Sequence, residues 1–155
     1  MLNEDYRDIL RCLLEEKADF IIVGAYALAA HGLPRATGDI DIFIKPDGSN
    51  SHKVYNALKA FGAPLSDISP DDFVEEGVIF QIGVAPRRVD IINSIDGVSY
   101  QDADSDKIIV PVDGLDLPVL SLNMLIKNKE ASGREKDLLD LKILHQHLKN
   151  ENNIP

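Results

Sequence analysis

The sequence predicts an α+β fold, in which a mixed β-sheet is flanked by helices and two further helices close the chain. Short apolar runs typical of buried strands are interspersed with segments of helical periodicity. The two kinds of segment do not alternate strictly, so the pattern does not favour a purely parallel βαβ sheet. The chain has 155 residues, of which 45% are hydrophobic and 27% charged. This composition is that of an ordinary globular protein, and residues 1–155 are most simply one domain.

The first half of the chain opens with an amphipathic helix over residues 4–16, because Tyr6, Ile9, Leu10, Leu13 and Leu14 follow helical spacing. The run DFIIVG at 19–24 is a short buried strand that ends at a glycine. AYALAAH at 25–31 is rich in good helix formers, and the glycine and proline that follow end it. DIDIFI at 39–44 is the next strand, PDGSN at 46–50 a turn, and 51–61 another helix.

The second half begins with two strands, GVIFQIGV at 77–84 and RRVDIIN at 87–93, which we expect to form a hairpin. KIIVPV at 107–112 and LDLPVL at 115–120 are weaker strand candidates. Each contains a proline, which cannot donate to a ladder, so both are predicted to be edge strands. Two helices, at about 121–131 and 134–149, are separated by ASGRE.

The overall charge limits the possible functions. A net charge of −10 argues against a nucleic-acid surface that spans the whole chain. Basic residues outnumber acidic ones in 121–149, so a local basic site is still allowed. Cys12 stands alone, which excludes an intrachain disulfide. No apolar run is long enough to span a bilayer, and the polar N-terminus is unlike a signal peptide. We therefore expect a cytoplasmic protein without a membrane segment.

Two aspartates interrupt the strand DIDIFI. Alternation along a strand puts Ile40, Ile42 and Ile44 on one face, with Asp39 and Asp41 on the other. Two neighbouring carboxylates on one face repel each other unless solvent or a positive group lies between them. Asp90, in RRVDIIN, would add a third carboxylate if its strand pairs beside DIDIFI. Such oxygen ligands suit Mg²⁺ or Mn²⁺.

The turn at Gly24 is a second candidate feature. A strand, a tight turn and a helix give the geometry in which backbone N–H groups face an anion, so Gly24 and Ala25 could bind a phosphate. Close packing at a strand-to-helix turn would also account for the small residues Gly24 and Ala25, without any ligand.

Taken in order, these motifs resemble a known family. G-A-x-A-x-x-x-H-G, then R-x-T-x-D-I-D, then a strand with V-D-I, resemble the minimal nucleotidyltransferases of the DNA polymerase β superfamily. The segment NKEASGREKDLLDL at 128–141 is similar to the closing motif of the branch that contains abortive-infection and toxin–antitoxin nucleotidyltransferases. The resemblance covers roughly residues 19–145 and implies a nucleotidyltransferase fold.

The resemblance also implies roles for particular residues. Gly24 and Ala25 match the pair that contacts the nucleotide phosphates, although many relatives carry serine in place of Ala25. Asp39 and Asp41 match the metal-binding pair, and Asp90 the third acid, which also helps to deprotonate the attacking hydroxyl. The late basic residues expected near the triphosphate are matched by Lys129 and Arg134.

Other residues have a less specific explanation. Arg35 could contact a phosphate or pair with a nearby acid. Lys129 and Arg134 could instead lie on exposed helix faces and pair with Glu130 or Asp137. Asp137 and Asp140 match the last acidic positions of the family motif, but helix capping or pairing with Lys136 would account for them too.

The sequence thus predicts an enzyme that uses Mg²⁺ or Mn²⁺ to move a nucleotidyl group from an NTP, such as ATP, to an acceptor. The acceptor could be an RNA, a protein or a small molecule. Two alternatives are a non-catalytic member of this fold, acting as the binding or regulatory half of a toxin–antitoxin pair, and a metal-dependent phosphohydrolase.

Overall fold

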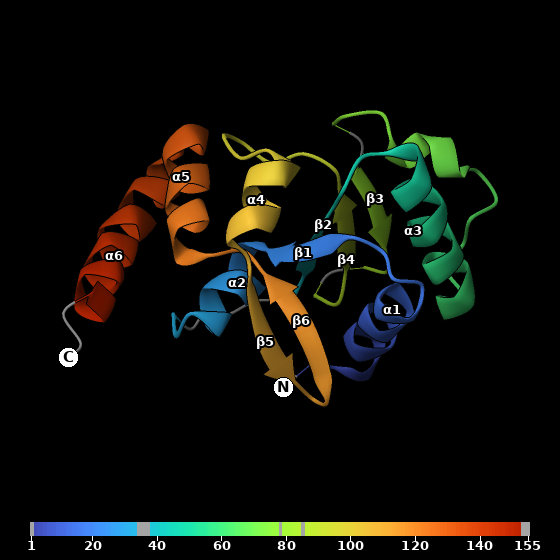
Figure 1. Ribbon diagram of the computed structural model, residues 1–155, viewed down its shortest axis with the longest axis horizontal. Helices are drawn as coiled ribbons and strands as arrows, with labels where there is room; N and C mark the ends of the chain where they lie inside the picture. Colours follow the sequence, from blue (N-terminus) through green and yellow to red (C-terminus); the bar gives the residue numbers. More distant parts are fainter. Residues whose placement is uncertain (1, 34–37, 78, 85, 153–155) are drawn as a thin grey trace.

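The computed structural model of the chain describes residues 2–33, 38–77, 79–84 and 86–152. These residues form a six-stranded sheet with the strand order β3-β4-β2-β1-β6-β5 (Figure 1). The strands are β1 (Phe20–Val23), β2 (Ile40–Ile44), β3 (Ile79–Ile82), β4 (Val89–Ile92), β5 (Ile108–Val112) and β6 (Leu115–Val119). β2 runs antiparallel to β1 but parallel to β4, and β1 and β6 are also parallel. The predicted α+β class with a mixed sheet is confirmed.

Helices lie around this sheet. They are α1 (Glu4–Glu15), α2 (Gly24–Ala30), α3 (Gly48–Phe61), α4 (Tyr100–Asp106), α5 (Leu122–Ser132) and α6 (Glu135–Asn152), and a single 3₁₀ turn, η1, spans Pro70–Phe73. Figure 1 shows α1 and α3 at one end of the molecule and α5 and α6 at the other, with the sheet between them. A T-shaped contact between the rings of Phe43 and Tyr100, whose centroids are 5.2 Å apart, places α4 on the sheet face that carries Asp41.

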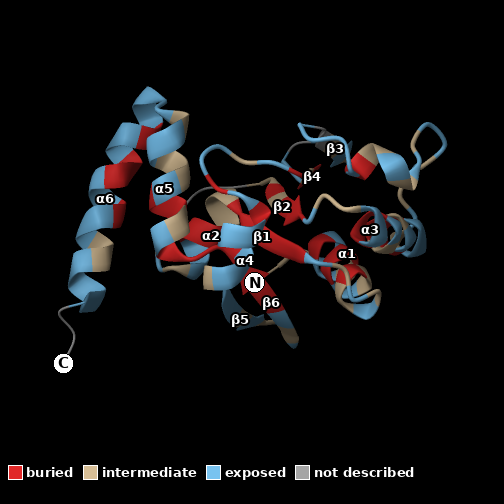
Figure 2. Cartoon of the chain, turned by 45° about the horizontal axis from the view of Figure 1, so that its top comes forward, coloured by how far each residue is buried: buried red, intermediate tan, exposed pale blue. Residues whose placement is uncertain are grey.

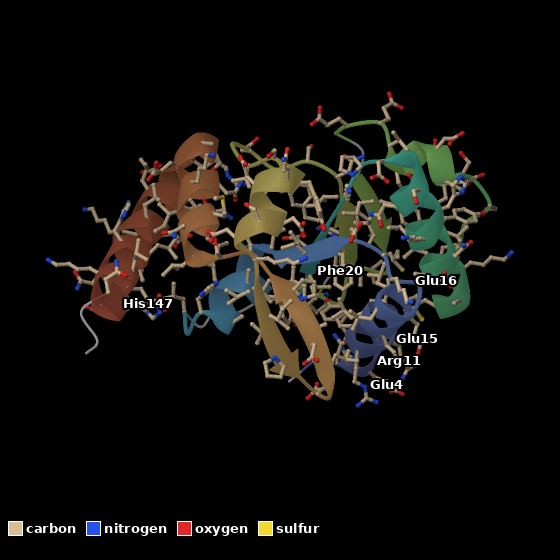
Figure 3. All side chains as sticks on the ribbon, in the orientation of Figure 1. Glu4, Arg11, Glu15, Glu16, Phe20 and His147 are labelled. Atoms are coloured by element: carbon tan, nitrogen blue, oxygen red, sulfur yellow. The ribbon has the colours of Figure 1, made fainter. Side chains whose placement is uncertain are left out.

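The core is centred on the middle strands. Every residue of β1 is buried, and so are four of the five residues of β2 (Figure 2). α1 contributes Tyr6, Ile9, Leu10 and Leu13, four of the five residues that the helical spacing predicts, whereas the fifth, Leu14, is only partly buried. Its charged residues, including Glu4, Arg11 and Glu15, project away from the sheet (Figure 3). Within the described part of the chain, no helix has the length and apolar character that a membrane crossing requires.

Most predicted elements are present, and the hairpin of β3 and β4 is confirmed as an antiparallel pair. The prediction for 115–120 is wrong in one respect, because β6 lies between β1 and β5 and is not an edge strand. Pro118 is tolerated there since β6 pairs with β1 only through Val119, opposite Ile22. The backbone N–H that donates to Ile22 belongs to Leu120, so the missing N–H of the proline is not needed.

Two short elements were not predicted. α4 and η1 lie in polar segments whose few apolar residues show no helical repeat. Ser99 caps α4, with its hydroxyl accepting from the backbone N–H of Asp102, and only Tyr100 and Ala103 of this helix are buried. The third helix also begins earlier than expected, at Gly48, because Asp47 caps it.

Candidate active site

The three predicted acids come together at neighbouring strands. β2 and β4 are parallel, and Asp41 lies directly opposite Asp90 in their register. Asp39 immediately precedes β2 and is two residues from Asp41, so the alternation of the strand directs both to the same face. Asp90 is buried, whereas Asp39 and Asp41 are partly exposed. We refer to Asp39, Asp41 and Asp90 as the acid group.

Gly24 leaves room for one of these carboxylates. It is the first residue of α2 and has a positive φ of 68°, which glycine adopts without steric cost. A Cβ atom added to Gly24 would lie 2.4 Å from Oδ2 of Asp41. The turn therefore needs glycine for its backbone shape and also for the space that the carboxylate of Asp41 fills.

The environment of Asp41 disfavours its ionised form. Burial raises the pKa of Asp41 to about 6, and the charge and hydrogen bond of Asp90 and the charge of Asp39 act in the same direction. The guanidinium of Arg88 opposes them. A nearby cation would oppose these effects and favour the ionised form of Asp41.

Arg88 supplies a positive group to the other two acids. Its Nε and Nη2 donate to Oδ1 and Oδ2 of Asp90, at 2.7 and 3.1 Å. Nη2 also lies 3.2 Å from Oδ2 of Asp39, and the backbone N–H of Arg88 donates to Oδ1 of Asp39 at 3.3 Å. All four carboxylate oxygens of Asp39 and Asp90 therefore contact Arg88. The hydrogen bond to Asp90 is the main reason that the pKa of Arg88 is raised further.

The type of ligand in the acid group fits a hard divalent cation, since three carboxylates from adjacent strands offer only oxygen. The arrangement is not a ready-made metal centre, however. Among the described residues, no cluster of three or more His, Cys, Asp or Glu side chains is gathered so that it could hold an ion. The oxygens of Asp39 and Asp90 are instead engaged by Arg88.

A cavity of about 260 Å³ lies beside the acid group, and we call it the site cavity. It lies between the end of β1 with the start of α2, the first half of β2, the end of β4 with the segment after it, and α5 with the turn that follows it. Its lining comprises Val23, Gly24, Asp41, Ile92, Ser94, Ile95, Asp96, Leu125, Asn128, Lys129 and Arg134. Four of the predicted site residues, Gly24, Asp41, Lys129 and Arg134, therefore share one cavity, and Asp41 belongs both to it and to the acid group.

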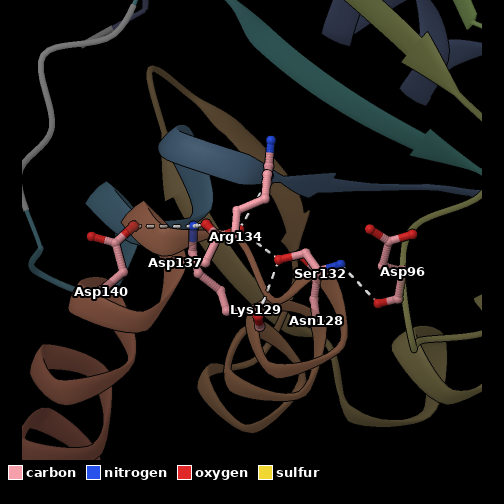
Figure 4. A network of polar contacts seen from close by, with 7 residues as sticks. All are labelled: Asp96, Asn128, Lys129, Ser132, Arg134, Asp137 and Asp140. Atoms are coloured by element: carbon pink, nitrogen blue, oxygen red, sulfur yellow. Dashed lines mark hydrogen bonds and ion pairs between the residues drawn. The ribbon is translucent and has the colours of Figure 1, made fainter.

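Lys129 and Arg134 are held by a network that joins α5 to α6 (Figure 4). Lys129 Nζ lies 3.0 Å from Oδ1 of Asp137 and 3.2 Å from Oδ2 of Asp140. Arg134 Nε donates to Oδ2 of Asp137 at 2.9 Å, and the hydroxyl of Ser132 donates to the same oxygen. Gly133, in the left-handed conformation with φ of 62°, ends α5 and makes this close return of the chain possible.

Asp137 is the centre of the network, with a side chain that is fully buried. Burial by itself would raise the pKa of Asp137, but hydrogen bonds from Ser132, Lys129 and Arg134 outweigh it and hold that pKa well below the usual range. Lys129 and Arg134 therefore do pair with Asp137, as the explanation of these two residues without a ligand requires. Both basic side chains nevertheless also line the site cavity. Lys129 is 14% exposed in its side chain and Arg134 66%.

The remaining predicted residues are placed as follows. Ala25 is the second residue of α2, but the residues that line the site cavity include Gly24 and not Ala25. Arg35 lies outside the described residues. Lys129 reaches Asp140 from the neighbouring helix and its Nζ lies 3.2 Å from Oδ2 of Asp140, an ion pair that the sequence alternatives of helix capping or pairing with Lys136 did not include.

Several site residues were not predicted. Arg88 could have been found, because the alternation of RRVDIIN puts it on the same face as Asp90, two residues later. Ser94, Asp96 and Asn128 line the site cavity through the segment after β4 and through α5. Asn128 donates to the backbone carbonyl of Asp96 at 2.8 Å, a contact between residues 32 apart that no local pattern signals.

Comparisons with known proteins bear on the fold. No family model matches the chain, and no curated protein matches it. A crystal structure of a Thermotoga maritima protein described as a candidate nucleotidyltransferase does match, with a TM-score of 0.56 over 97% of this chain and 96% of that one. The two sequences are 18% identical. At this identity the likeness concerns the fold alone, and this chain has the nucleotidyltransferase fold.

Proposed function

We propose that the protein transfers a nucleotidyl group from an NTP to a hydroxyl acceptor. The observation that carries this proposal is the site cavity, which brings Gly24, Asp41, Lys129 and Arg134 together next to the acid group. Lys129 and Arg134 on one side, and a divalent cation held by the acid group on the other, would balance the negative charge of a triphosphate. The fold shared with the Thermotoga maritima protein supports the same reaction class.

In this proposal Asp39, Asp41 and Asp90 hold Mg²⁺ or Mn²⁺. When bound, the ion would neutralise phosphate charge and lower the pKa of the attacking hydroxyl. Because the positive charge of the ion favours an ionised carboxylate beside it, Asp41 would then lose its proton well below its metal-free pKa of about 6. Asp90 is the candidate to accept the hydroxyl proton.

The proposed reaction is a single displacement at the α-phosphorus of the NTP. The acceptor oxygen attacks the α-phosphorus, a new P–O bond forms, and the bond from the α-phosphorus to the leaving pyrophosphate breaks. The proton of the acceptor passes to Asp90 and then to water. Lys129 is suited to the leaving group, since its contacts with Asp137 and Asp140 account for two of its three donor hydrogens. The exposed guanidinium of Arg134 offers further donors to the same charge.

The test is incubation of the protein with each α-³²P-labelled NTP, Mg²⁺ or Mn²⁺, and separate pools of RNA, protein and small-molecule acceptors. We expect label on one acceptor pool with the wild type. Asp41→Asn and Asp90→Asn should lower the rate by a factor on the order of a thousand or more, because each removes a cation ligand. Asp116→Asn, an exposed aspartate of β6, is the matched control and should keep the wild-type rate.

The other outcomes discriminate between the alternatives. Label released by water and not transferred would indicate a phosphohydrolase. No turnover with any NTP and any acceptor would contradict enzymatic transfer.

A non-catalytic binding module is the second candidate, and Arg88 is the observation that favours it. A chain that needs no cation to balance Asp39 and Asp90 can keep this fold without catalysis. In that case the protein would act as one half of a toxin–antitoxin pair in the cytoplasm. Co-expression with the product of the adjacent gene, followed by co-purification, tests this. A stable complex together with no turnover would favour the module over the enzyme.

A further inference from the structure

We propose that Arg88 is a built-in competitor of the divalent cation: it occupies Asp39 and Asp90 in the metal-free protein and must release them before the cation binds. The inference deepens the proposed function and rests on it. It concerns the affinity of the acid group for metal, which can be measured without nucleotide or acceptor.

The contacts of Arg88 use the atoms that a metal would need. Two hydrogen bonds cover both oxygens of Asp90, and two further contacts cover both oxygens of Asp39, at distances of 2.7–3.3 Å. A divalent cation takes such oxygens at about 2.0–2.6 Å and within a regular coordination shell. Each of these oxygens keeps a second lone pair, but the guanidinium places a positive charge directly against both carboxylates and repels a divalent cation brought to them. Binding of one therefore opposes binding of the other.

Arg88 is suited to this role because it stays charged at every physiological pH. Its planar fork matches a carboxylate in a bidentate manner, as it does at Asp90. The competition is therefore decided by cation concentration and not by protonation of the arginine. An uncharged partner would leave the acid group repelling itself whenever metal is scarce.

Release of Arg88 is sterically possible. Its side chain is 31% exposed, so the guanidinium is not enclosed by the core and can turn toward solvent about its own torsions. The backbone around it is fixed, because the carbonyl of Arg88 accepts from the backbone N–H of Ile40 and from the hydroxyl of Tyr6. Exchange of guanidinium for metal thus requires movement of one side chain while the strands keep their register.

The experiment is titration of Mn²⁺ into the nucleotide-free protein, with free Mn²⁺ measured by electron paramagnetic resonance. We expect Arg88→Gln to bind Mn²⁺ about tenfold more tightly than the wild type, since the charge-assisted contacts no longer have to be broken. Arg87→Gln is the matched control: it removes the same charge from the adjacent, exposed position and should change the affinity by less than about twofold. Asp41→Asn added to Arg88→Gln should abolish the tight binding, which locates it at the acid group.

Arg88→Lys keeps the charge and loses the bidentate fork, so it should also bind Mn²⁺ more tightly than the wild type. It decides the question if Arg88→Gln does not fold. Equal or weaker binding in the Arg88 variants, or an equal gain in Arg87→Gln, would overturn the inference and leave the proposed transfer reaction intact. No Mn²⁺ binding by the wild type or any variant would overturn the inference together with the metal site. Tighter binding in the variants without nucleotidyl transfer by the wild type would uphold the inference and reject the reaction.

Discussion

Asp41 contacts two different parts of the site, the turn at Gly24 and the neighbouring strand β4. Its carboxylate fills the space that Gly24 leaves at the start of α2, and it also faces Asp90 across the strand pair. Burial and like charge raise its pKa to about 6, so in the metal-free protein its ionised form is disfavoured relative to the unfolded chain. A residue in this position lowers the stability of the fold, and on the proposed function a bound cation would offset that cost.

We therefore predict that Asp41→Asn stabilises the metal-free protein. A carboxyl with a raised pKa destabilises the fold above that pKa, and the effect is absent below the unfolded value near 4, where the group is protonated in both states. The gain should be about 1 kcal/mol above pH 6, since solvent reduces the full value, and should vanish below about pH 4. Urea unfolding of both proteins with chelator, at several pH values, measures it. A mutant less stable than the wild type at pH 7 would show that Asp41 has a structural role.

Among the elements, the pair of α5 and α6 is joined mainly by charge at the end that faces the site cavity. A buried carboxylate, Asp137, receives donors from Lys129 and Ser132 on α5 and from Arg134 in the turn. The outer surface of α6 remains exposed at Leu138, Leu139 and Ile143. The ion pairs therefore fix how the basic residues of α5 and of the turn are presented to the site cavity.

Replacing Asp137 should lower the free energy of unfolding by more than replacing its exposed partner Arg134. Asp137→Asn leaves Lys129 with Asp140 alone and should cost about 3 kcal/mol at pH 7, the scale of breaking a buried pair. Arg134→Met removes a partner that is 66% exposed and should cost less than about 1 kcal/mol. Since the pKa of Asp137 is lowered by folding, its contribution is full above about pH 4 and declines as the pH falls further. Chemical unfolding at pH 7 and pH 3 tests both statements, and equal costs for the two variants at pH 7 would contradict them.

For the whole molecule, the sequence predicted the strands that build the acid group and missed the contacts between distant segments. Alternation in DIDIFI and RRVDIIN predicted the face of each strand that carries Asp41 and Asp90, because a strand has a fixed period of two. That the two residues lie side by side depended on the pairing of β2 with β4, which alternation alone does not predict. The proline in 115–120 was misleading, since whether it is tolerated depends on which atoms pair with β1. The ion pair between Lys129 and Asp140 could not be predicted either, because the two residues lie on different helices. The sequence pattern of one helix does not show how it packs against another.

The sheet order gives a prediction for hydrogen exchange. β1 lies between β2 and β6 and is wholly buried, whereas β5 is an edge strand of which three residues are exposed. We expect the amides of Ile21, Ile22 and Ile42 to exchange at the rate of global unfolding. The amides of β5, which are those of Ile108, Ile109, Val110 and Val112 because Pro111 has none, should exchange through local opening at least tenfold faster. Native-state exchange followed by NMR or mass spectrometry measures this. Similar protection in β1 and β5 would indicate that the sheet opens only as a unit.

The site cavity joins the start of α2 to the turn after α5, so its walls come from parts of the chain more than 100 residues apart. Closing so long a loop is entropically costly and makes such contacts form late in folding. During synthesis the acid group emerges from the ribosome well before Lys129 and Arg134, and N-terminal segments begin to fold first. A nascent chain therefore exposes its carboxylates before α5 and the turn after it exist to complete the site cavity. On the proposed function, the order of the chain itself would delay nucleotide binding until the last helices are made.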